Sequence, residues 1–444
     1  MNTKIKISLT PNHDKAIKIN MKYIIALCII LIVGCKSNHM FRRDTEECKK
    51  PQKNNCAESC IIRSDCTDYP YTLSFVEIDD QGHFQSRAQL NKVIKFIKSQ
   101  DHQDIVIFIH GWHCNAQPDD KSLKNFEKML KSISQRYETQ NEKIKRKING
   151  IFVGWRGESI PVKLINIATF WDRKDVSIEV GAGSLIELLV RLENIAKNNN
   201  KCRLISIGHS FGASVLFSAT KNILYQNFIN SFESNEISGF GDLVILINPA
   251  FEAIPYAPLR DITEEYAREY AKKLNTATIF KKPMKPKLLI LTSESDYATR
   301  LFFKIGRFFS STLFENHNEI KRIDRNGNIQ KFSQRSMNIN AIGHYKPFQT
   351  HTLKSVDPIQ LTSCNAMPAK WDDMIEYDDT SDKTSKEGWS ILFPASKLRL
   401  RHIKNSPAFS PYWVVVVDKN VIPGHNEIYQ VNLNCFIEEL LLAR

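Results

Sequence analysis

The chain has 444 residues, of which 42% are hydrophobic and 25% are charged, and this composition is typical of a globular protein with a sizeable core. The formal net charge of +13 would suit an anionic partner. The lysines are spread widely, however, and no recognition-helix or zinc-finger pattern accompanies them. Composition and charge therefore argue against a nucleic-acid partner and favour an ordinary solvated surface.

An apolar run near the N-terminus has the form of a targeting signal. Residues 23–33 are eleven apolar residues followed by Gly34 and Cys35, whereas a helix needs about twenty apolar residues to span a bilayer. Lysines precede the run, as in the positive region of a signal peptide. The ending "LIVGC" resembles the bacterial lipobox, in which the cysteine is lipidated before cleavage. Residues 1–34 are expected to be a lipoprotein-type signal peptide, with a plain secretory signal and an uncleaved apolar anchor as alternatives.

Lipidation would decide where the protein resides. Acyl chains on Cys35 would hold the mature chain at a membrane surface. We therefore expect an exported protein that is anchored to the bacterial cell envelope through Cys35. In a Gram-negative cell this would be the outer membrane or a periplasm-facing membrane.

Four cysteines crowd into nineteen residues of a polar segment, residues 35–70, that has no periodicity. In a reducing cytosol such a cluster would suggest zinc, whereas after export an even number of cysteines predicts disulfides. We expect two bridges, with three pairings open, and a cysteine-rich tether ahead of the folded domain. The four are Cys48, Cys56, Cys60 and Cys66, whereas Cys114, Cys202, Cys364 and Cys435 are buried thiols or further bridges.

From residue 71 the pattern alternates between strand-like and helix-like segments. Residues 104–109 form a continuous apolar run, which is typical of a strand buried on both faces of a parallel sheet. The alternation predicts an α/β protein with a mostly parallel central sheet and helices on both faces. Residues 297–410 lack this rhythm and are expected to form a cap or lid inserted before the last strand. Strands are expected at 72–78, 104–109, 151–155, 203–207, 243–247, 287–292 and 412–417, and helices at 86–98, 122–136, 180–197, 213–225, 262–274 and 433–443.

The stretch "GHSFG", residues 208–212, lies between an expected strand and an expected helix. A serine at such a tight turn needs glycines two positions to either side so that neighbouring backbone can pass close by. The turn exposes the hydroxyl and points the start of the helix at a developing negative charge. The pattern alone is common, but its strand–turn–helix setting predicts that Ser210 is a catalytic nucleophile.

An acid and a histidine follow two later strands. Asp296 follows the strand at 287–292, and His425 follows the last expected strand. Since the active site of a parallel sheet lies outside the carboxyl ends of its strands, we expect both near Ser210. A carboxylate there holds the histidine tautomer, and the imidazole takes the serine proton. The alternatives are Glu294 for the acid, and His344 and His351, within the insertion, for the base.

The serine turn, the pair His110-Gly111, Asp296 and His425 together resemble the α/β-hydrolase family over residues 71–444, in the family's chain order Ser, Asp, His. Within it the chain looks like a lipase- or esterase-like bacterial branch. The resemblance implies the α/β-hydrolase fold and cleavage of a small-molecule or lipid carboxylic ester through an acyl-enzyme, without a cofactor. An acyltransferase or peptidase with the same triad, or a non-catalytic lipoprotein of this fold, are the alternatives.

The resemblance also implies an oxyanion hole formed by the backbone amides of Trp112 and Phe211. His110 is expected to be structural and to bond the loop backbone. Together with His113 and Cys114 it fits no metal-ligand spacing, so no metal is expected. Candidates to line the cleft are Trp155, Arg156, Trp171 and Arg173.

Overall fold

The structure is a computed structural model that describes most of the chain after residue 38. The described residues are 39–49, 56–64, 70–139, 146–157, 166–199, 201–231, 237–274, 283–315, 318–357, 361–377, 388–403, 406 and 410–443. The expected signal peptide, Cys35 and Cys66 lie outside them. Across the described ranges, every helix is too short or too polar to cross a membrane.

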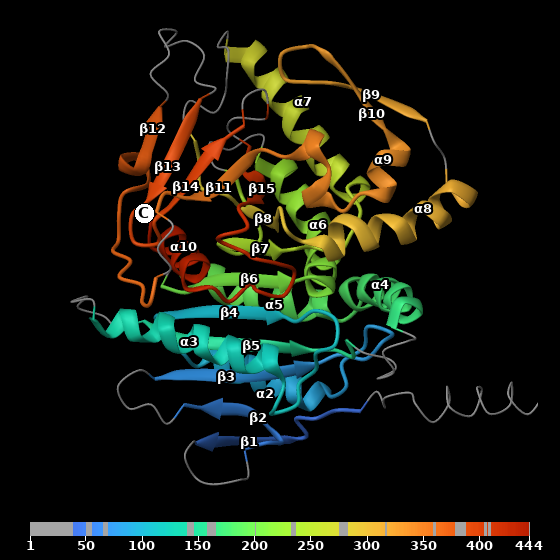
Figure 1. The fold of residues 1–444 in the computed structure, drawn as a ribbon. Coiled ribbons are helices and arrows are strands. Elements are labelled where there is room, and N and C mark those ends of the chain that lie inside the picture. Colours follow the sequence, from blue (N-terminus) through green and yellow to red (C-terminus); the bar gives the residue numbers. More distant parts are fainter. Residues whose placement is uncertain are drawn as a thin grey trace, which may run out of the picture.

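One thirteen-stranded sheet runs through the molecule (Figure 1). In spatial order it contains β1 (Asp44–Lys49), β2 (Ser59–Arg63), β3 (Tyr71–Glu77), β5 (Lys147–Gly154), β4 (Gln103–Ile109), β6 (Arg203–His209), β7 (Leu243–Ile247), β8 (Leu288–Ser293), β15 (Tyr412–Val417), β11 (His351–Ser355), β14 (Leu398–His402), β13 (Trp389–Phe393) and β12 (Ile375–Tyr377). Every pair of neighbours from β3 to β11 is parallel, whereas the pairs from β11 to β12 are antiparallel. The expected α/β architecture with a mostly parallel central sheet is confirmed.

Helices cover both faces of the sheet because side chains alternate between the faces along each strand. In β4, Ile105 and Ile107 belong to one core, whereas Val106 and Phe108 belong to the other. The first core includes α2 (Arg87–Lys98), α4 (Asn166–Ala182), α5 (Leu185–Lys197), α6 (Phe211–Asn230) and α7 (Ala257–Leu274). The second includes α3 (Lys121–Thr139) and α10 (Val431–Leu442).

The single helix expected at residues 180–197 is two helices, α4 and α5. The backbone N–H of Ser184 donates to the carbonyl of Gly82, at 2.6 Å, and not to a carbonyl of α4. This bond to a separate loop interrupts the helical ladder between the two elements.

Part of the segment expected to be a tether is built into the sheet. β1 pairs in parallel with β2, and β2 pairs antiparallel with β3. Cys48 and Cys56 form a disulfide, as expected for this cluster. The second bridge, however, does not involve Cys60, which is a free thiol with no exposed surface. Its side chain faces the first core from β2, and this packing explains why the prediction was wrong for Cys60.

The insertion at residues 297–410 has two parts of different kinds. Its second part supplies β11 to β14, which extend the sheet beyond β15, so that this part is not a cap. Its first part lies outside the sheet, next to α7 (Figure 1). That first part contains the π-helical turn η3 (Ala298–Phe302), α8 (Phe303–Phe314), the hairpin β9 (Glu319–Ile323) and β10 (Ile329–Ser333), α9 (Gln334–Ile339), and the short turns η4 (Ile342–His344) and η5 (Lys346–Phe348). The remaining short turns are η2 (Ile254–Tyr256) and η6 (Trp371–Met374).

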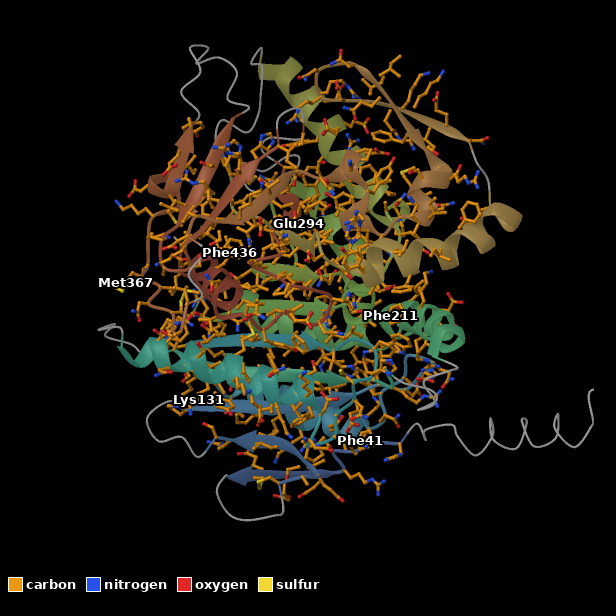
Figure 2. The ribbon with its side chains drawn as sticks, in the orientation of Figure 1. Phe41, Lys131, Phe211, Glu294, Met367 and Phe436 are labelled. Atoms are coloured by element: carbon orange, nitrogen blue, oxygen red, sulfur yellow. A yellow bond between two sulfur atoms is a disulfide. The ribbon has the colours of Figure 1, made fainter. Side chains whose placement is uncertain are left out.

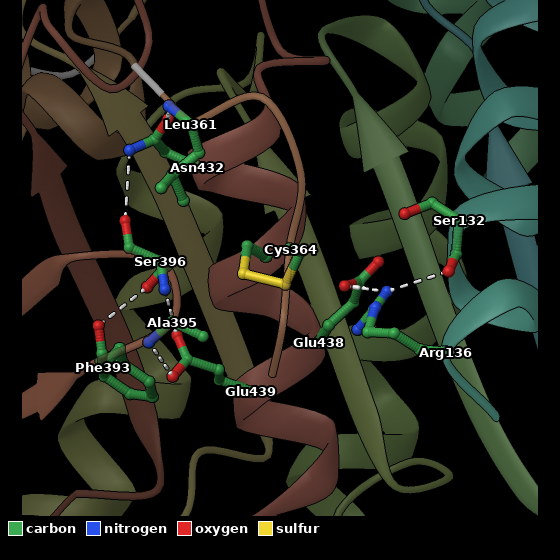
Figure 3. The surroundings of a disulfide bond; sticks show 11 residues. Ser132, Arg136, Leu361, Cys364, Phe393, Ala395, Ser396, Asn432, Glu438 and Glu439 are labelled. Carbon is green, nitrogen blue, oxygen red and sulfur yellow. Dashed lines mark hydrogen bonds and ion pairs between the residues drawn. A yellow bond between two sulfur atoms is a disulfide. The ribbon is translucent and has the colours of Figure 1, made fainter. Parts of the chain in front are cut away.

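The C-terminal helix α10 is fixed to this sheet extension (Figure 3). A disulfide joins Cys364 to Cys435 of α10 across a sequence separation of 71 residues. The carboxylate of Glu439 accepts the backbone N–H groups of Ala395 and Ser396, each at 2.8 Å. Since α10 follows the loop that carries His425, these contacts fix one end of that loop.

Candidate active site

Ser210 lies at a strained turn between β6 and α6. Its backbone has φ 56° and ψ −119°, which is uncommon for a residue other than glycine. The turn is held by β7 and the loop after it: Ser210 N–H donates to the carbonyl of Ile247 at 3.0 Å, and its own carbonyl accepts the N–H of Ala250 at 3.1 Å. The predicted strand–turn–helix setting of the serine is present.

The two glycines of this turn are required by close approach. A Cβ at Gly208 would lie 2.6 Å from the carbonyl oxygen of Gly212, in the first turn of α6. A Cβ at Gly212 would lie 2.1 Å from the carbonyl oxygen of Ile109, at the end of β4. Any larger residue would push α6 away from the sheet and displace Ser210.

The structure brings the three predicted residues together. His425 Nε2 lies 2.8 Å from Ser210 Oγ, and His425 Nδ1 lies 2.9 Å from Asp296 Oδ1. Because a carboxylate can only accept hydrogen bonds, Nδ1 of His425 carries the proton and donates to Asp296. Nε2 then accepts a hydrogen bond from the hydroxyl of Ser210. The residues follow β6, β8 and β15, so the site lies at the carboxyl ends of the parallel strands.

The alternative acid and one alternative base lie elsewhere. Glu294 is exposed, and its carboxylate accepts the backbone N–H of Lys419. His351 is fully buried within β11, where its Nδ1 is 2.8 Å from the hydroxyl of Thr350. Burial, with the neighbouring His402, holds the pKa of His351 well below its usual value, so this ring is neutral.

The other alternative base, His344, lies behind the acid. The hydroxyl of Thr299 donates to Asp296 Oδ2, so it accepts from His344 Nε2, 3.0 Å away. The backbone N–H of Thr299 also donates to Asp296 Oδ1, at 3.1 Å. Burial, only partly offset by the Asp296 charge, lowers the pKa of His344 to about 4. His344 is therefore a neutral donor at the far end of a chain that runs through Thr299 and Asp296 to His425.

Asp296 has no exposed surface, yet it is held in its charged form. Desolvation alone would raise the pKa of this carboxyl group. The interaction with His425 and the hydrogen bonds from His425 and Thr299 outweigh desolvation and leave the pKa below its usual value.

Two further residues hold the backbone of His425. His209 Nε2 lies 2.8 Å from the His425 carbonyl oxygen, and the side-chain amide of Asn248 donates to the same oxygen at 2.9 Å. Asn248 Oδ1 in turn accepts the N–H of Ser293 at 2.9 Å, which ties the clamp to β8. Burial, then the neighbouring His425, lowers the pKa of His209 to about 3, so the ring is a neutral donor. Sequence reasoning missed Thr299, His209 and Asn248, although His209 lies inside the serine motif.

The loop expected to supply the other oxyanion donor lies directly against Ser210. A Cβ at Gly111 would lie 3.0 Å from Cβ of Ser210. Phe211 is the first residue of α6, where backbone N–H groups point out of the helix start, and it is labelled in Figure 2. The rings of Trp112 and Phe211 meet edge to face with centroids 6.5 Å apart. Phe211 therefore adjoins Ser210 in the chain, and Trp112 follows Gly111 and contacts Phe211 through its ring.

His110 bonds the loop backbone, as predicted. It is fully buried, and its Nε2 accepts the backbone N–H of Trp155 at 3.1 Å, so that Nδ1 carries the proton toward the carbonyl of Gly111 at 3.0 Å. The indole N–H of Trp155 donates to the His110 carbonyl, and the two rings stack. His110 thus fixes the loop that follows β4.

The arginines proposed to line the cleft converge on one buried carboxylate. Asp80 accepts a hydrogen bond from Arg156 and one from Arg173 at 3.0 Å. A cavity of about 150 Å³ lies nearby, with Trp155, Arg156 and Cys114 in its lining but none of the three triad residues. The side chain of Trp171 lies outside the described residues.

Among the described side chains, no group of three or more His, Cys, Asp or Glu is arranged to hold a metal ion. No protein-family model and no curated protein matches the chain. Its function is therefore inferred from the geometry of the site.

Proposed function

We propose that the protein is a serine hydrolase of the α/β-hydrolase type that cleaves a carboxylic ester through an acyl-enzyme on Ser210. One observation carries the proposal: a continuous hydrogen-bonded chain from Ser210 Oγ through His425 to a fully buried Asp296, with heavy-atom distances of 2.8 and 2.9 Å. These distances are within the range required of a nucleophile and its general base. A serine that served only the turn would need neither partner.

The chemistry follows from this chain. Ser210 Oγ attacks the ester carbonyl carbon as His425 Nε2 takes its proton, and the charged Asp296 stabilises the resulting imidazolium. The oxyanion faces the amides of Phe211 and Trp112. His425 then protonates the leaving alcohol, which leaves the acyl group on Ser210. Water attacks this acyl-enzyme with His425 as base again, which releases the acid and regenerates the serine hydroxyl.

The strand positions support the same reaction class. The nucleophile follows a central strand, and the acid and the base follow β8 and β15, which are neighbours in the sheet. Thr299, His209 and Asn248 restrain the acid and the base from outside, as expected of a preorganised catalytic unit.

The test is labelling of the full chain with a fluorophosphonate probe, followed by turnover of a panel of activated esters. The native chain is expected to be labelled and to turn over esters. S210A should lose labelling and lower kcat by at least about 10³-fold, and H425A should lower kcat on the same scale. The double variant should be little worse than either single variant, because members of one catalytic unit are strongly non-additive.

The matched control is Ser218→Ala, which changes a serine of the same helix whose hydroxyl bonds the carbonyl of Ile178. This variant should keep native labelling and rate. Native-like labelling of S210A would show that Ser210 is only a turn residue. Faster cleavage of amides than of matched esters would make the protein a peptidase.

We further propose export and lipid anchoring through Cys35, on the basis of the apolar run that ends in "LIVGC". Metabolic labelling with a fatty-acid analogue should mark the native chain but not C35S. Equal incorporation by both would refute the assignment.

A further inference from the structure

A set of exposed apolar side chains lies on the segment that starts directly after Asp296. We call it the apolar stripe. The stripe lies on η3 and α8. Figure 1 shows α8 on the side of the molecule toward which the arrowheads of the central strands point. The exposed fractions within the stripe are Tyr297 62%, Leu301 47%, Phe302 63%, Ile305 49% and Phe308 41%.

The spacing of these residues puts most of them on one face of the helical segment formed by η3 and α8. Tyr297, Leu301 and Ile305 follow one another at four-residue intervals, so they project from the same side. The opposite side carries Thr299 and Phe303, which are buried against the protein. A helix on the surface of a globular domain ordinarily directs polar residues outward. Here both faces carry large apolar side chains.

Positive charge borders the apolar stripe. Arg300 and Lys304 are exposed and are also four residues apart, so they form a basic row beside it. Residues 297–314 contain three cationic side chains and no aspartate or glutamate. The third, Arg307, is paired with the buried carboxylate of Glu252 at 2.6 Å. An apolar face with a basic border is the pattern of a helix that lies in the interface of an anionic bilayer.

We propose that the apolar stripe is a docking surface for an anionic lipid bilayer. Leu301, Phe302 and Ile305 enter the boundary between headgroups and acyl chains, and Arg300 and Lys304 pair with lipid phosphates. Docking holds the acid end of the triad at the membrane, because Thr299 of the same segment bonds Asp296. Binding to vesicles is measured without turnover, so this inference and the proposed hydrolysis stand or fall separately.

The experiment is co-sedimentation of the full chain with vesicles, in a C35S background so that no acyl chain is attached. Vesicles of phosphatidylcholine alone are compared with mixed vesicles, which contain equimolar phosphatidylcholine and phosphatidylglycerol. The variant L301S/F302S/I305S is expected to lower binding to the mixed vesicles about tenfold or more. All variants have the same N-terminal region, so any vesicle binding that this region contributes is the same in each of them.

The matched control is I323S/I329S in the hairpin of β9 and β10. These two isoleucines are 52% and 67% exposed, as much as the residues of the stripe. The control should bind mixed vesicles as the native chain does. An equal loss in the control would show a general effect of surface hydrophobicity and would overturn the proposal.

The basic border is tested by R300Q/K304Q, which removes no apolar group and leaves the buried side of the helix intact. This variant should bind mixed vesicles about tenfold more weakly at low salt, and the difference should shrink as salt is added. Binding to phosphatidylcholine alone should not change. Thermal unfolding shows whether the triple serine variant is folded. If it is not, R300Q/K304Q still tests the proposal.

Two further results would overturn the proposal. One is native-like binding of mixed vesicles by both the triple serine and the double glutamine variants. The other is a concentration-dependent dimer of the native chain that the triple serine variant abolishes while vesicle binding stays absent. In that case the apolar stripe is a contact between two copies of the chain.

Discussion

Ser210 keeps a backbone conformation that costs of the order of 1–3 kcal/mol, so the surrounding structure has to maintain it. The hydrogen bonds to Ile247 and Ala250 do so from the end of β7 and the loop that follows. The same principle applies to the acid, which Thr299 holds through its hydroxyl and its backbone N–H. At the scale of single residues, the geometry of the site depends on the hydrogen bonds that hold Ser210 and Asp296 in place as much as on the three residues themselves.

We expect T299V to lower both the free energy of unfolding and the catalytic rate. Removing the hydroxyl leaves one oxygen of the buried Asp296 without that partner, which should cost about 1.5–3 kcal/mol in a urea titration. Because the carboxylate is then free to turn, the orientation of His425 loosens, and kcat should fall about tenfold with little change in KM. Thr299→Ser restores the hydroxyl and should restore the rate.

Thr263→Val is the matched control for this prediction. Thr263 is also buried, and its hydroxyl donates to the carbonyl of Arg260 in α7. The control should be destabilised but keep the native kcat. A loss of rate that Ser at position 299 fails to rescue would assign Thr299 a packing role only.

Sequence order sufficed to predict that Ser210, Asp296 and His425 lie together, because each follows a strand of the parallel sheet. The residues around them could not be predicted in the same way. Asn248 and His209 form hydrogen bonds with the backbone carbonyl of His425, which lies far along the chain from both. Asn248 and His425, for example, are 177 residues apart. Such a contact depends on which strands become neighbours, and no local pattern contains that information.

At the scale of elements, the fully buried strands and amphipathic helices were predictable, whereas the half-buried strands that extend the sheet beyond β15 were not. β7 and β15 have the predicted bounds, and every residue of β7 is buried. β11 and β14 have alternating burial, with polar residues at the less buried positions, so their apolar content is too low to stand out from a loop. Their identity as strands comes from pairing with β15 and with each other.

The disulfide between Cys364 and Cys435 is an element-scale restraint whose strength can be measured. It closes a loop with a sequence separation of 71 residues, which in the chain-entropy model is worth about 4 kcal/mol. The bridge between Cys48 and Cys56 spans only 8 residues and should be worth about 2.5 kcal/mol. We expect C364A/C435A to lower the free energy of unfolding more than C48A/C56A does in urea titrations under oxidising conditions. An equal or smaller loss would mean that α10 is held by its packing alone.

At the scale of the whole molecule, buried neutral histidines predict sensitivity to acid. Burial lowers the pKa of His209 to about 3 and that of His344 to about 4, against about 6.5 for an unfolded histidine. Between pH 6.5 and these values the unfolded chain binds more protons, so stability falls as the pH falls. Each of the two should remove about 2 kcal/mol between pH 7 and pH 5.

Urea titrations at pH 7 and pH 5 test this expectation. H344Q should lose about 2 kcal/mol less than the native chain on acidification, because its unfolded state no longer gains that proton. H83Q alters a histidine whose side chain is 75% exposed and should behave as the native chain does. If H344Q and the native chain lose the same free energy, His344 is protonated in the folded state at pH 5.

β15 is close to the end of the chain, yet in the sheet it lies between β8 and β11. The base that follows it reaches a serine 215 residues earlier in the chain. During synthesis, residues up to Thr299 can assemble the serine turn and Asp296 while the position beside β8 that β15 will occupy is still empty. Ser210 therefore has no hydrogen bond to His425 until β15 has taken its place between β8 and β11. Under the proposed function, the protein is inert toward esters until β15 has joined the sheet.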